Sequence, residues 1–356
     1  MQKGRASICL EHEPVITAYA TVAGQKEGEG PLGFGMDRIE TDATLSKRNW
    51  EEAESQLQKE VLGLLFQKGK IEKGDIRYLF AGDLLGQLIA TSFGIADFGI
   101  PLFGLYGACS TMGEGMALAA MAVNAGYADH VAALASSHFA SAEKQFRFPL
   151  GYGNQRPFSA TWTVTGCGGV VISKKGMLDQ NGEPCTQYAR ITGITPGKVV
   201  DIGCKDSMNM GAAMAPAAFD TIVRHFQDFD CGPEEYDKII TGDLGIVGQN
   251  ILMDLMEKKG CDIRDRHMDC GLEIYARQTQ DVHSGGSGCG CSAVTLGAYI
   301  LPRLFDGTWK KVLFLPTGAL LSTVSFNEGK SIPGISHAVV LEAPVDKENK
   351  RRMRRE

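Results

Sequence analysis

The sequence predicts an α/β protein with layered sheets and helices, built from two duplicated halves. Short, nearly continuous apolar runs alternate with helical patterns, which is typical of a mostly parallel or mixed sheet covered on both faces. Two distant stretches repeat the same order of parts, as an internal duplication does. A chain of 356 residues with 44% hydrophobic and 22% charged residues is also long and apolar enough for a large buried core.

The repeat begins with a pair of matching strands. Ile76–Asp83 reads as a buried strand and is followed by a helix over Leu84–Phe93. In the second half Tyr236–Asp243 has the same pattern, followed by a helix over Gln249–Lys259. Both strands end in Gly-Asp, which strengthens the match.

The next parts repeat as well. Tyr106–Gly126 predicts a Cys-Ser turn followed by a helix rich in small residues, and Ser287–Leu304 repeats this pattern. The matching pairs are Cys109-Ser110 and Cys291-Ser292. The later strands of each half are expected over His130–Ser137, Lys310–Gly318, Thr165–Ser173 and Ile335–Ala343.

Polar segments set the expected boundaries. Lys174–Gln187 loses the apolar pattern and is rich in turn formers, so we expect an N-terminal half over residues 1–180 and a C-terminal half over 181–345. Residues 346–356 form a tail with six Lys and Arg residues. A second polar stretch, Gly24–Asn49, is long for a loop in a compact domain, and loops of that length are often functional.

Composition excludes several classes of protein. A net charge of −6 and a pI of about 5.7 argue against nucleic acid as the main partner. The N-terminus lacks the apolar run of a signal peptide, and no segment reaches the roughly 18 apolar residues of a membrane span. The ten cysteines are scattered, so we expect reduced, mostly buried thiols. Cys289 and Cys291 lack the spacing of a structural zinc site.

Cys109 is the sharpest candidate for chemistry. It follows a predicted strand and a Gly-flanked turn and precedes a helix, where free N–H groups and the helix dipole favour a thiolate. Such a cysteine can be a nucleophile or line an anion site. A small thiol can also simply pack well at this position.

The GACS turn resembles the nucleophile elbow of the thiolase and ketosynthase superfamily. This resemblance extends from about Ile8 to Ala343 and implies the thiolase-like αβαβα fold, together with a homodimer formed through the sheet of the first half.

Three longer segments, YGACSTMGEG, FPLGYGNQRPFSATWTVTGCGG and HSGGSGCGCSAVTLGAY, resemble the stage V sporulation protein AD family of endospore-forming bacteria. The resemblance implies a protein that binds dipicolinic acid (pyridine-2,6-dicarboxylic acid) and acts in its uptake into the developing spore. It further implies peripheral attachment to the forespore or spore inner membrane, beside membrane-embedded proteins of the same machinery. The basic tail could attract an anionic membrane surface, although a solvated terminus is the simpler reading.

The sequence departs from the catalytic pattern of condensing enzymes. Where ketosynthases place a histidine after the second-half strand, this chain has Asp243, and a carboxylate near Cys109 would raise the pKa of the thiol. VHSGGSGCG replaces the expected Gly-Asn turn and offers His283 and Ser284. We therefore expect no catalytic residues and a pocket retained for binding.

Two alternatives to a binding protein remain at this stage. In an active condensing enzyme, Cys109 would form an acyl-enzyme from an acyl-coenzyme A or acyl-carrier donor, and His283 or His138 would shuttle protons. In a purely structural interaction protein, the pocket would be vestigial.

The expected ligand site combines residues at strand ends with arginines. Cys109, His138, Asp243, His283 and Ser284 are placed there, because ligands of open α/β sheets bind at such ends. His138 could equally be a core histidine. A calcium ion carried with the ligand could be bridged by Asp243, and no other cofactor is expected. Arg147 and Arg156 could pair with the carboxylates of dipicolinate, and the neighbouring aromatic residues could stack on its ring, namely Phe146, Phe148, Tyr152 and Phe158.

Overall fold

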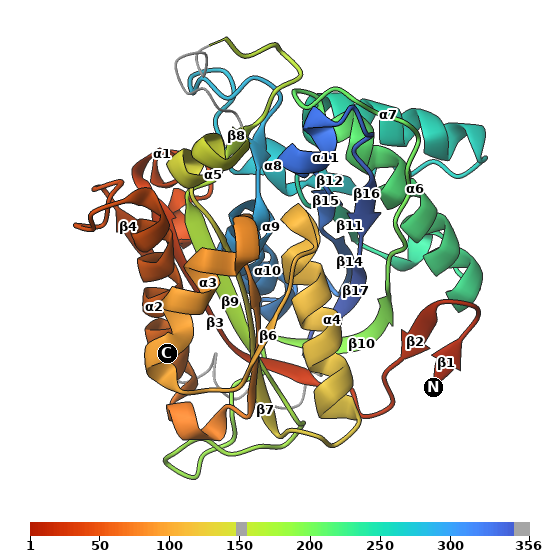
Figure 1. Ribbon diagram of the computed structural model, residues 1–356. Helices are drawn as coiled ribbons and strands as arrows, with labels where there is room; N and C mark the ends of the chain where they lie inside the picture. The colour runs from red at the N-terminus through yellow and green to blue at the C-terminus, as the bar shows by residue number, and fades with distance from the viewer. Residues whose placement is uncertain (147–154, 345–356) are drawn as a thin grey trace.

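Five alternating layers of helix and sheet make up the fold (Figure 1). The computed structural model describes residues 1–146 and 155–344. The first sheet has the strand order β3-β9-β7-β5-β6, and the second has the order β10-β17-β14-β11-β12. Their bounds are β3 Val15–Gly24, β5 Tyr78–Gly82, β6 Leu102–Gly104, β7 His130–Ser137, β9 Gly166–Ser173, β10 Ala189–Thr195, β11 Lys238–Thr241, β12 His267–Asp269, β14 Lys311–Leu315 and β17 Ala338–Glu342.

The two sheets repeat the same pattern of strand directions. In each sheet the first two neighbouring pairs are antiparallel and the next two are parallel. This repetition confirms the predicted fold of two duplicated halves. The sheets are also joined to each other, because Ala189 and Arg190 of β10 pair with Ile16 and Val15 of β3.

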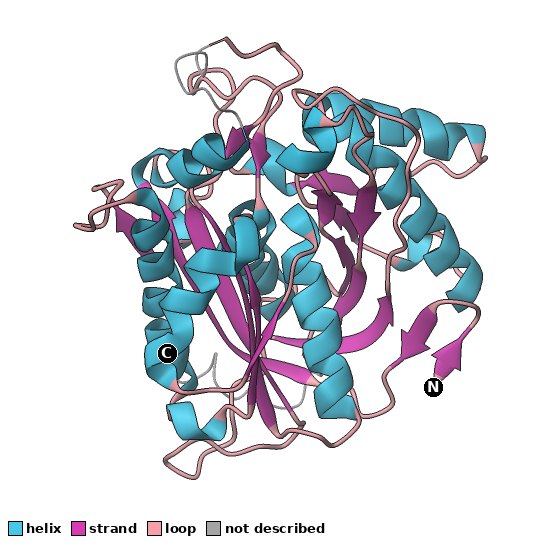
Figure 2. Ribbon diagram, in the orientation of Figure 1, coloured by secondary structure: helices cyan, strands magenta, loops and turns pink. Residues whose placement is uncertain are grey.

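Two helices fill the space between the sheets. α4 packs on β5 and β7 and reaches β17, whereas α9 packs on β9 and β7, and every residue of α9 is buried. On the outer faces, α2 and α3 cover the first sheet, and α6 and α7 cover the second (Figure 2). Their bounds are α2 Trp50–Gly69, α3 Ile89–Ile95, α4 Thr111–Asn124, α6 Met210–Phe229, α7 Gly245–Lys258 and α9 Cys289–Thr295.

The remaining elements are short. The helices are α1 Gln25–Gly28, α5 Phe139–Phe146, α8 Cys270–Glu273, α10 Leu301–Phe305 and α11 Thr323–Asn327. The strands are β1 Gln2–Lys3, β2 Ser7–Cys9, β4 Arg38–Glu40, β8 Trp162–Thr163, β13 Gly286–Ser287, β15 Thr317–Ala319 and β16 Gly334–Ser336. The parallel pair of β8 with β13 links a loop of one half to a loop of the other.

Two predicted helices begin elsewhere than expected. The helix predicted over Leu84–Phe93 begins only at Ile89, as α3, because Gln87 and Leu88 adopt positive φ angles and form a turn. The helix predicted over Gln249–Lys259 begins earlier, at Gly245, as α7. The Asp269 carboxylate accepts hydrogen bonds from the backbone N–H groups of Leu244 and Gly245 at 2.9 and 3.2 Å, which supports this earlier start. A side chain from another strand thus satisfies the first N–H groups of this helix.

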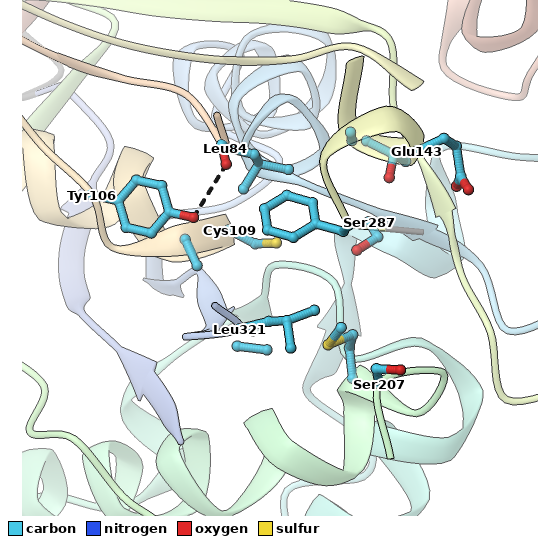
Figure 3. A pocket seen from close by; sticks show the side chains of 13 residues that line it. Leu84, Tyr106, Cys109, Glu143, Ser207, Ser287 and Leu321 are labelled. Carbon is cyan, nitrogen blue, oxygen red and sulfur yellow. Dashed lines mark hydrogen bonds between the residues drawn. The ribbon is translucent and has the colours of Figure 1, made fainter. Parts of the chain in front are cut away.

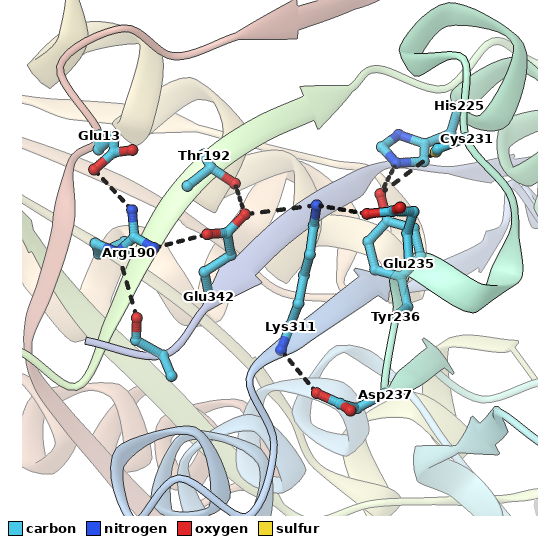
Figure 4. Close-up of polar contacts among 11 residues, drawn as sticks. Glu13, Arg190, Thr192, His225, Cys231, Glu235, Tyr236, Asp237, Lys311 and Glu342 are labelled. Atoms are coloured by element: carbon cyan, nitrogen blue, oxygen red, sulfur yellow. Dashed lines mark hydrogen bonds and ion pairs between the residues drawn. The ribbon is translucent and has the colours of Figure 1, made fainter. Parts of the chain in front are cut away.

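A cluster of ion pairs lies beside the junction of the sheets (Figure 4). Arg190 on β10 binds Glu13 at 2.8 Å and Glu342 at 2.7 Å, and Lys311 approaches Glu342 at 3.6 Å. These groups remain partly exposed, so each pair is expected to contribute about 1 kcal/mol or less.

The long polar segment Gly24–Asn49 is anchored at one buried carboxyl group. Glu27 accepts hydrogen bonds from the Tyr275 hydroxyl and the Thr165 N–H group, and burial raises its pKa. The basic tail predicted from the sequence lies outside the described residues. Within the described part of the chain, every helix is too short or too polar to cross a bilayer.

Candidate functional site

A cavity with about 590 Å³ of empty space, open mouth included, lies where the two halves meet (Figure 3). Its walls are mostly apolar, with a few hydroxyls, one thiol and one carboxyl group. Both halves contribute to the lining, which consists of Leu84, Tyr106, Ala108, Cys109, Ala142, Glu143, Phe146, Thr163, Ser207, Met210, Ser287, Ala319 and Leu321.

Cys109 sits on a tight elbow between β6 and α4. Ala108 has a positive φ of 47°, which turns the chain sharply before the cysteine. The hydroxyls of Ser110 and Thr111 donate to the carbonyls of Gly107 and Ala108 at 2.6 and 2.7 Å. These bonds hold the strained turn, so that the thiol is presented to the cavity.

Gly318 from the second half closes the elbow from behind. A Cβ atom at Gly318 would lie 2.3 Å from the carbonyl oxygen of Gly107, so only glycine lets the two backbones approach this closely.

Asp243 lies behind Cys109 and is 1% exposed. Its Oδ2 accepts from the Ser287 hydroxyl at 3.0 Å and the Gly288 N–H group at 2.9 Å, and its Oδ1 accepts from the Thr317 hydroxyl at 2.9 Å. The Cys109 thiol is the fourth donor. A carboxylate has about four lone-pair sites, so this one is saturated.

This environment keeps Cys109 as a thiol. Burial raises the pKa of Cys109 well above its usual value, and the neighbouring Asp243 carboxylate and Cys289 raise it further. Burial likewise raises the pKa of Asp243 to about 6, against the lowering effect of its hydrogen bonds. The thiolate that a helix start alone would favour is therefore disfavoured here.

Cys289 and Cys291 both lie at the start of α9, which begins at Cys289, whereas Cys109 precedes the start of α4 at Thr111. The Cys289 thiol donates to the Ala108 carbonyl at 3.0 Å, directly beside the elbow.

The two predicted histidines are not brought to this cavity. His138 lines a second cavity with Trp50, Phe139 and Trp162, and its ring nitrogens contact the Ala43 carbonyl and the Ala140 N–H group. His283 contacts the Pro157 carbonyl at 2.9 Å and Asp281 at 3.2 Å. Both rings are held by local partners away from Cys109.

The other predicted residues also lie apart. Ser284 is buried and its carbonyl accepts from the Ile246 N–H group, so it shapes the loop before β13. Arg156 binds Asp281 at 2.6 Å and lies over the Trp162 ring. Arg147, Phe148 and Tyr152 lie outside the described residues. Phe158 is exposed and lies against His283, whereas Phe146 is found in the cavity wall.

Several lining residues were not predicted from the sequence. Ser287 stands two residues before Cys289 in the Gly-rich turn, and this position in the sequence could have indicated that it lines the cavity. Ala142 and Glu143 on α5, and Ser207, Met210 and Leu321 in the second half, carry no local signal, because their place depends on how distant loops meet.

No group of three or more His, Cys, Asp or Glu side chains within residues 1–146 and 155–344 is arranged to hold a metal ion. All four lone-pair sites of Asp243 already accept hydrogen bonds. A calcium ion entering with a ligand would therefore have to be held by the ligand and by other oxygens.

Solved structures with the same fold include OleA and a 3-oxoacyl-[acyl-carrier-protein] synthase III. The chain superimposes on a variant of OleA from Xanthomonas campestris with a TM-score of 0.57 at 14% identity, covering 94% of this chain and 99% of that one. It superimposes on 3-oxoacyl-[acyl-carrier-protein] synthase III from Aquifex aeolicus VF5 with a TM-score of 0.54 at 10% identity, covering 92% and 99%. At this identity the likeness establishes the thiolase-like fold alone.

Sequence comparison is more specific. The chain is 42% identical over 339 residues to stage V sporulation protein AD of Bacillus subtilis (strain 168), covering 95% of this chain and 97% of that protein. The family model for stage V sporulation protein AD matches residues 4–342. The chain therefore belongs to the stage V sporulation protein AD family.

Proposed function

We propose that this protein binds dipicolinic acid, free or as its calcium chelate, in the Cys109 cavity. In this proposal it serves uptake of the ligand into the developing spore, at the forespore membrane beside membrane-embedded proteins of the same machinery. The main support is the group that contacts the thiol. Cys109 faces the buried Asp243 carboxylate, which disfavours a thiolate, whereas the chemistry of a condensing enzyme needs a thiolate. The cavity is kept while the activation of its nucleophile is lost.

The lining of the cavity suits a small ligand that is partly apolar and partly polar. Leu84, Phe146 and Leu321 supply apolar wall, and the hydroxyls of Ser207 and Ser287 supply polar contacts. Mostly apolar pockets with a few placed polar groups are typical of small-molecule sites. A pyridine ring with two carboxylates matches this combination.

Substitution of Ala142 by leucine is expected to weaken dipicolinate binding at least tenfold, because the added atoms fill the cavity. Ala140→Leu on the same helix is the matched control, because Ala140 lines the second cavity instead. Isothermal titration with and without calcium measures both variants, with isophthalic acid as the ligand that lacks the ring nitrogen. Thermal melts verify that both variants fold.

Two outcomes would contradict the proposal. One is the absence of dipicolinate binding by the wild-type protein in either buffer. The other is acylation of Cys109 by an acyl-coenzyme A, seen as a mass increase, which would instead identify an active condensing enzyme.

We also propose that two copies associate along β6. This strand ends the first sheet and pairs only with β5 in the described part of the chain, and its Leu102 and Phe103 side chains are 37% and 50% exposed. An open edge with exposed apolar side chains is suited to pairing with a second copy about a two-fold axis.

Leu102→Lys is expected to convert this dimer to a monomer, because a charge on the strand edge opposes pairing. Light scattering coupled to size exclusion measures the mass. Leu178→Lys, at an exposed leucine in the loop between the halves, is the control and should leave the dimer intact. A wild-type protein that elutes as a monomer at micromolar concentration would refute the interface.

A further inference from the structure

We propose that an anion entering the Cys109 cavity is bound together with one proton, which Asp243 receives. Asp243 would then control whether Cys109 and Ser287 offer hydrogens to the ligand. This inference rests on the proposed function, since it concerns the same cavity and the same anionic ligand.

Asp243 controls the hydrogens that two residues of the cavity wall can donate. Cys109 and Ser287 both line the cavity, and each has a single side-chain hydrogen that can be donated in a hydrogen bond. Both hydrogens are directed at Asp243, from Ser287 at 3.0 Å and from the Cys109 thiol. While Asp243 is ionised, these two groups present only lone pairs to the cavity, and lone pairs repel a carboxylate ligand.

The charge of Asp243 also opposes an anionic ligand. Asp243 lies directly behind the cavity wall at Cys109, and no Lys, Arg or His lines the cavity among the residues that the structure describes. A ligand carboxylate would therefore meet negative charge in a region of low dielectric, where like charges repel strongly. A proton on Asp243 removes the charge closest to Cys109.

Protonation also reverses one hydrogen bond. The acid form of Asp243 donates a hydrogen to one neighbour from which it previously accepted. The Gly288 N–H group is part of the backbone and cannot turn, but a hydroxyl or a thiol can. Thr317 already accepts from the Asp243 N–H group at 3.3 Å and does not line the cavity, so the proposal assigns the reversed bond to Cys109 or Ser287. The released hydrogen of that residue then points into the cavity. One proton is taken from the buffered solvent and forms the O–H bond of the Asp243 acid, and no other covalent bond in the protein or ligand changes.

The other titratable groups around Asp243 leave it as the acceptor of that proton. Thiols with raised pKa values surround it and stay neutral at and below neutral pH. Burial raises the pKa of Asp269, and its hydrogen bonds from Thr241 and from two backbone N–H groups oppose this rise. Asp269 does not line the cavity, so a bound anion acts on it less than on Asp243. The surrounding thiols are Cys109, Cys270, Cys289 and Cys291.

The direction of the pH effect follows from this linkage. In the free protein the pKa of Asp243 is about 6, and a bound anion raises it further. Between these two values binding takes up a proton, so the affinity falls as the pH rises, by up to about tenfold per pH unit. Below the lower value Asp243 already carries the proton, and the affinity levels off.

The test is calorimetric titration of the full chain with dipicolinate between about pH 6 and pH 8, without calcium, in buffers of different ionisation enthalpy. We expect uptake of close to one proton per ligand near pH 7. Asp243→Asn carries a neutral amide at every pH, so it should bind with an affinity that is independent of pH and should take up no proton. Asp269→Asn, at an equally buried aspartate, should keep the wild-type pH profile.

The outcomes separate this inference from the proposed function. The inference would be overturned if the wild-type protein binds dipicolinate without taking up a proton. It would also be overturned if the Asp243→Asn variant keeps the wild-type pH profile. Both outcomes would leave dipicolinate binding intact. Absence of binding at every pH would overturn both. If Asp243→Asn does not fold, the proton count of the wild-type protein decides alone.

Discussion

Replacement of Gly168 by alanine is expected to lower the free energy of unfolding by about 3 kcal/mol, at the upper end for overpacked cores. Gly168 lies in β9, against the buried helix α9. A Cβ atom there would lie 2.2 Å from the carbonyl oxygen of Ala293 and 2.3 Å from its carbonyl carbon. β9 is hydrogen-bonded on both sides, to β3 and β7, so neither element can move away.

Chemical denaturation of the purified variant measures this loss. Gly63→Ala is the matched control, because Gly63 lies within helix α2 and a Cβ atom there meets nothing within 4 Å. Alanine at that position should raise the free energy of unfolding by about 0.5–1 kcal/mol. Equal effects of the two substitutions would show that the contact between β9 and α9 is looser than described.

Glu54→Gln is expected to remove a large pH dependence of stability. Glu54 is fully buried on α2, and its two oxygens accept from the hydroxyls of Ser136 and Ser141 at 2.9 and 2.7 Å. Burial, and then the negative charge of Asp83, raise its pKa from 4.5 to about 8.

The sign follows from the protons bound in each state. Between about pH 4.5 and pH 8 the folded state keeps the proton of Glu54 and the unfolded state releases it. The free energy of unfolding therefore falls as the pH rises through this window, by about 1.4 kcal/mol per pH unit. Below the window both states are protonated and this contribution to stability is fully present.

Glutamine reproduces the protonated side chain. Its amide can donate to the Ser141 hydroxyl, which can turn toward the His138 carbonyl at 3.0 Å. We expect similar stability of variant and wild type at about pH 5, and a variant more stable by about 3 kcal/mol at pH 7. Denaturation curves at the two pH values measure this difference. Glu51→Gln on the same helix removes a partly exposed ion pair and should leave the pH dependence in place; a parallel loss in Glu54→Gln and Glu51→Gln would contradict the assignment.

The strands of this fold could be predicted because they are defined by local pattern. His130–Ser137 is a continuous run of buried residues and forms β7 with the expected bounds. Asp83 and Asp243 likewise lie just beyond the ends of β5 and β11. Helix starts were less predictable, because the start at Gly245 depends on the side chain of Asp269, which comes from another strand.

The candidate site could be predicted only in part. Cys109 and Asp243 were identified because each stands at the end of a strand, and strand ends of the two halves meet. His138 also follows a strand, but hydrogen bonds to Ala43 and Ala140 hold its ring in the second cavity. His283 has a positive φ of 49°, which turns it away from the following strand β13. Such directions depend on contacts between residues far apart in the chain.

The central position of α9 has a consequence for synthesis of the protein. The helix spans residues 289–295, late in the chain, yet it packs against β7 and β9 of the first half. β10, which pairs with the first strand of that half, is also made later. In a nascent chain on the ribosome, α4 can cover part of the inner face of the first sheet, but the part of β7 and β9 that α9 covers stays open until the second half is made. We expect a chaperone to bind this open part during translation, and the first half to reach its native state only when the second half has emerged.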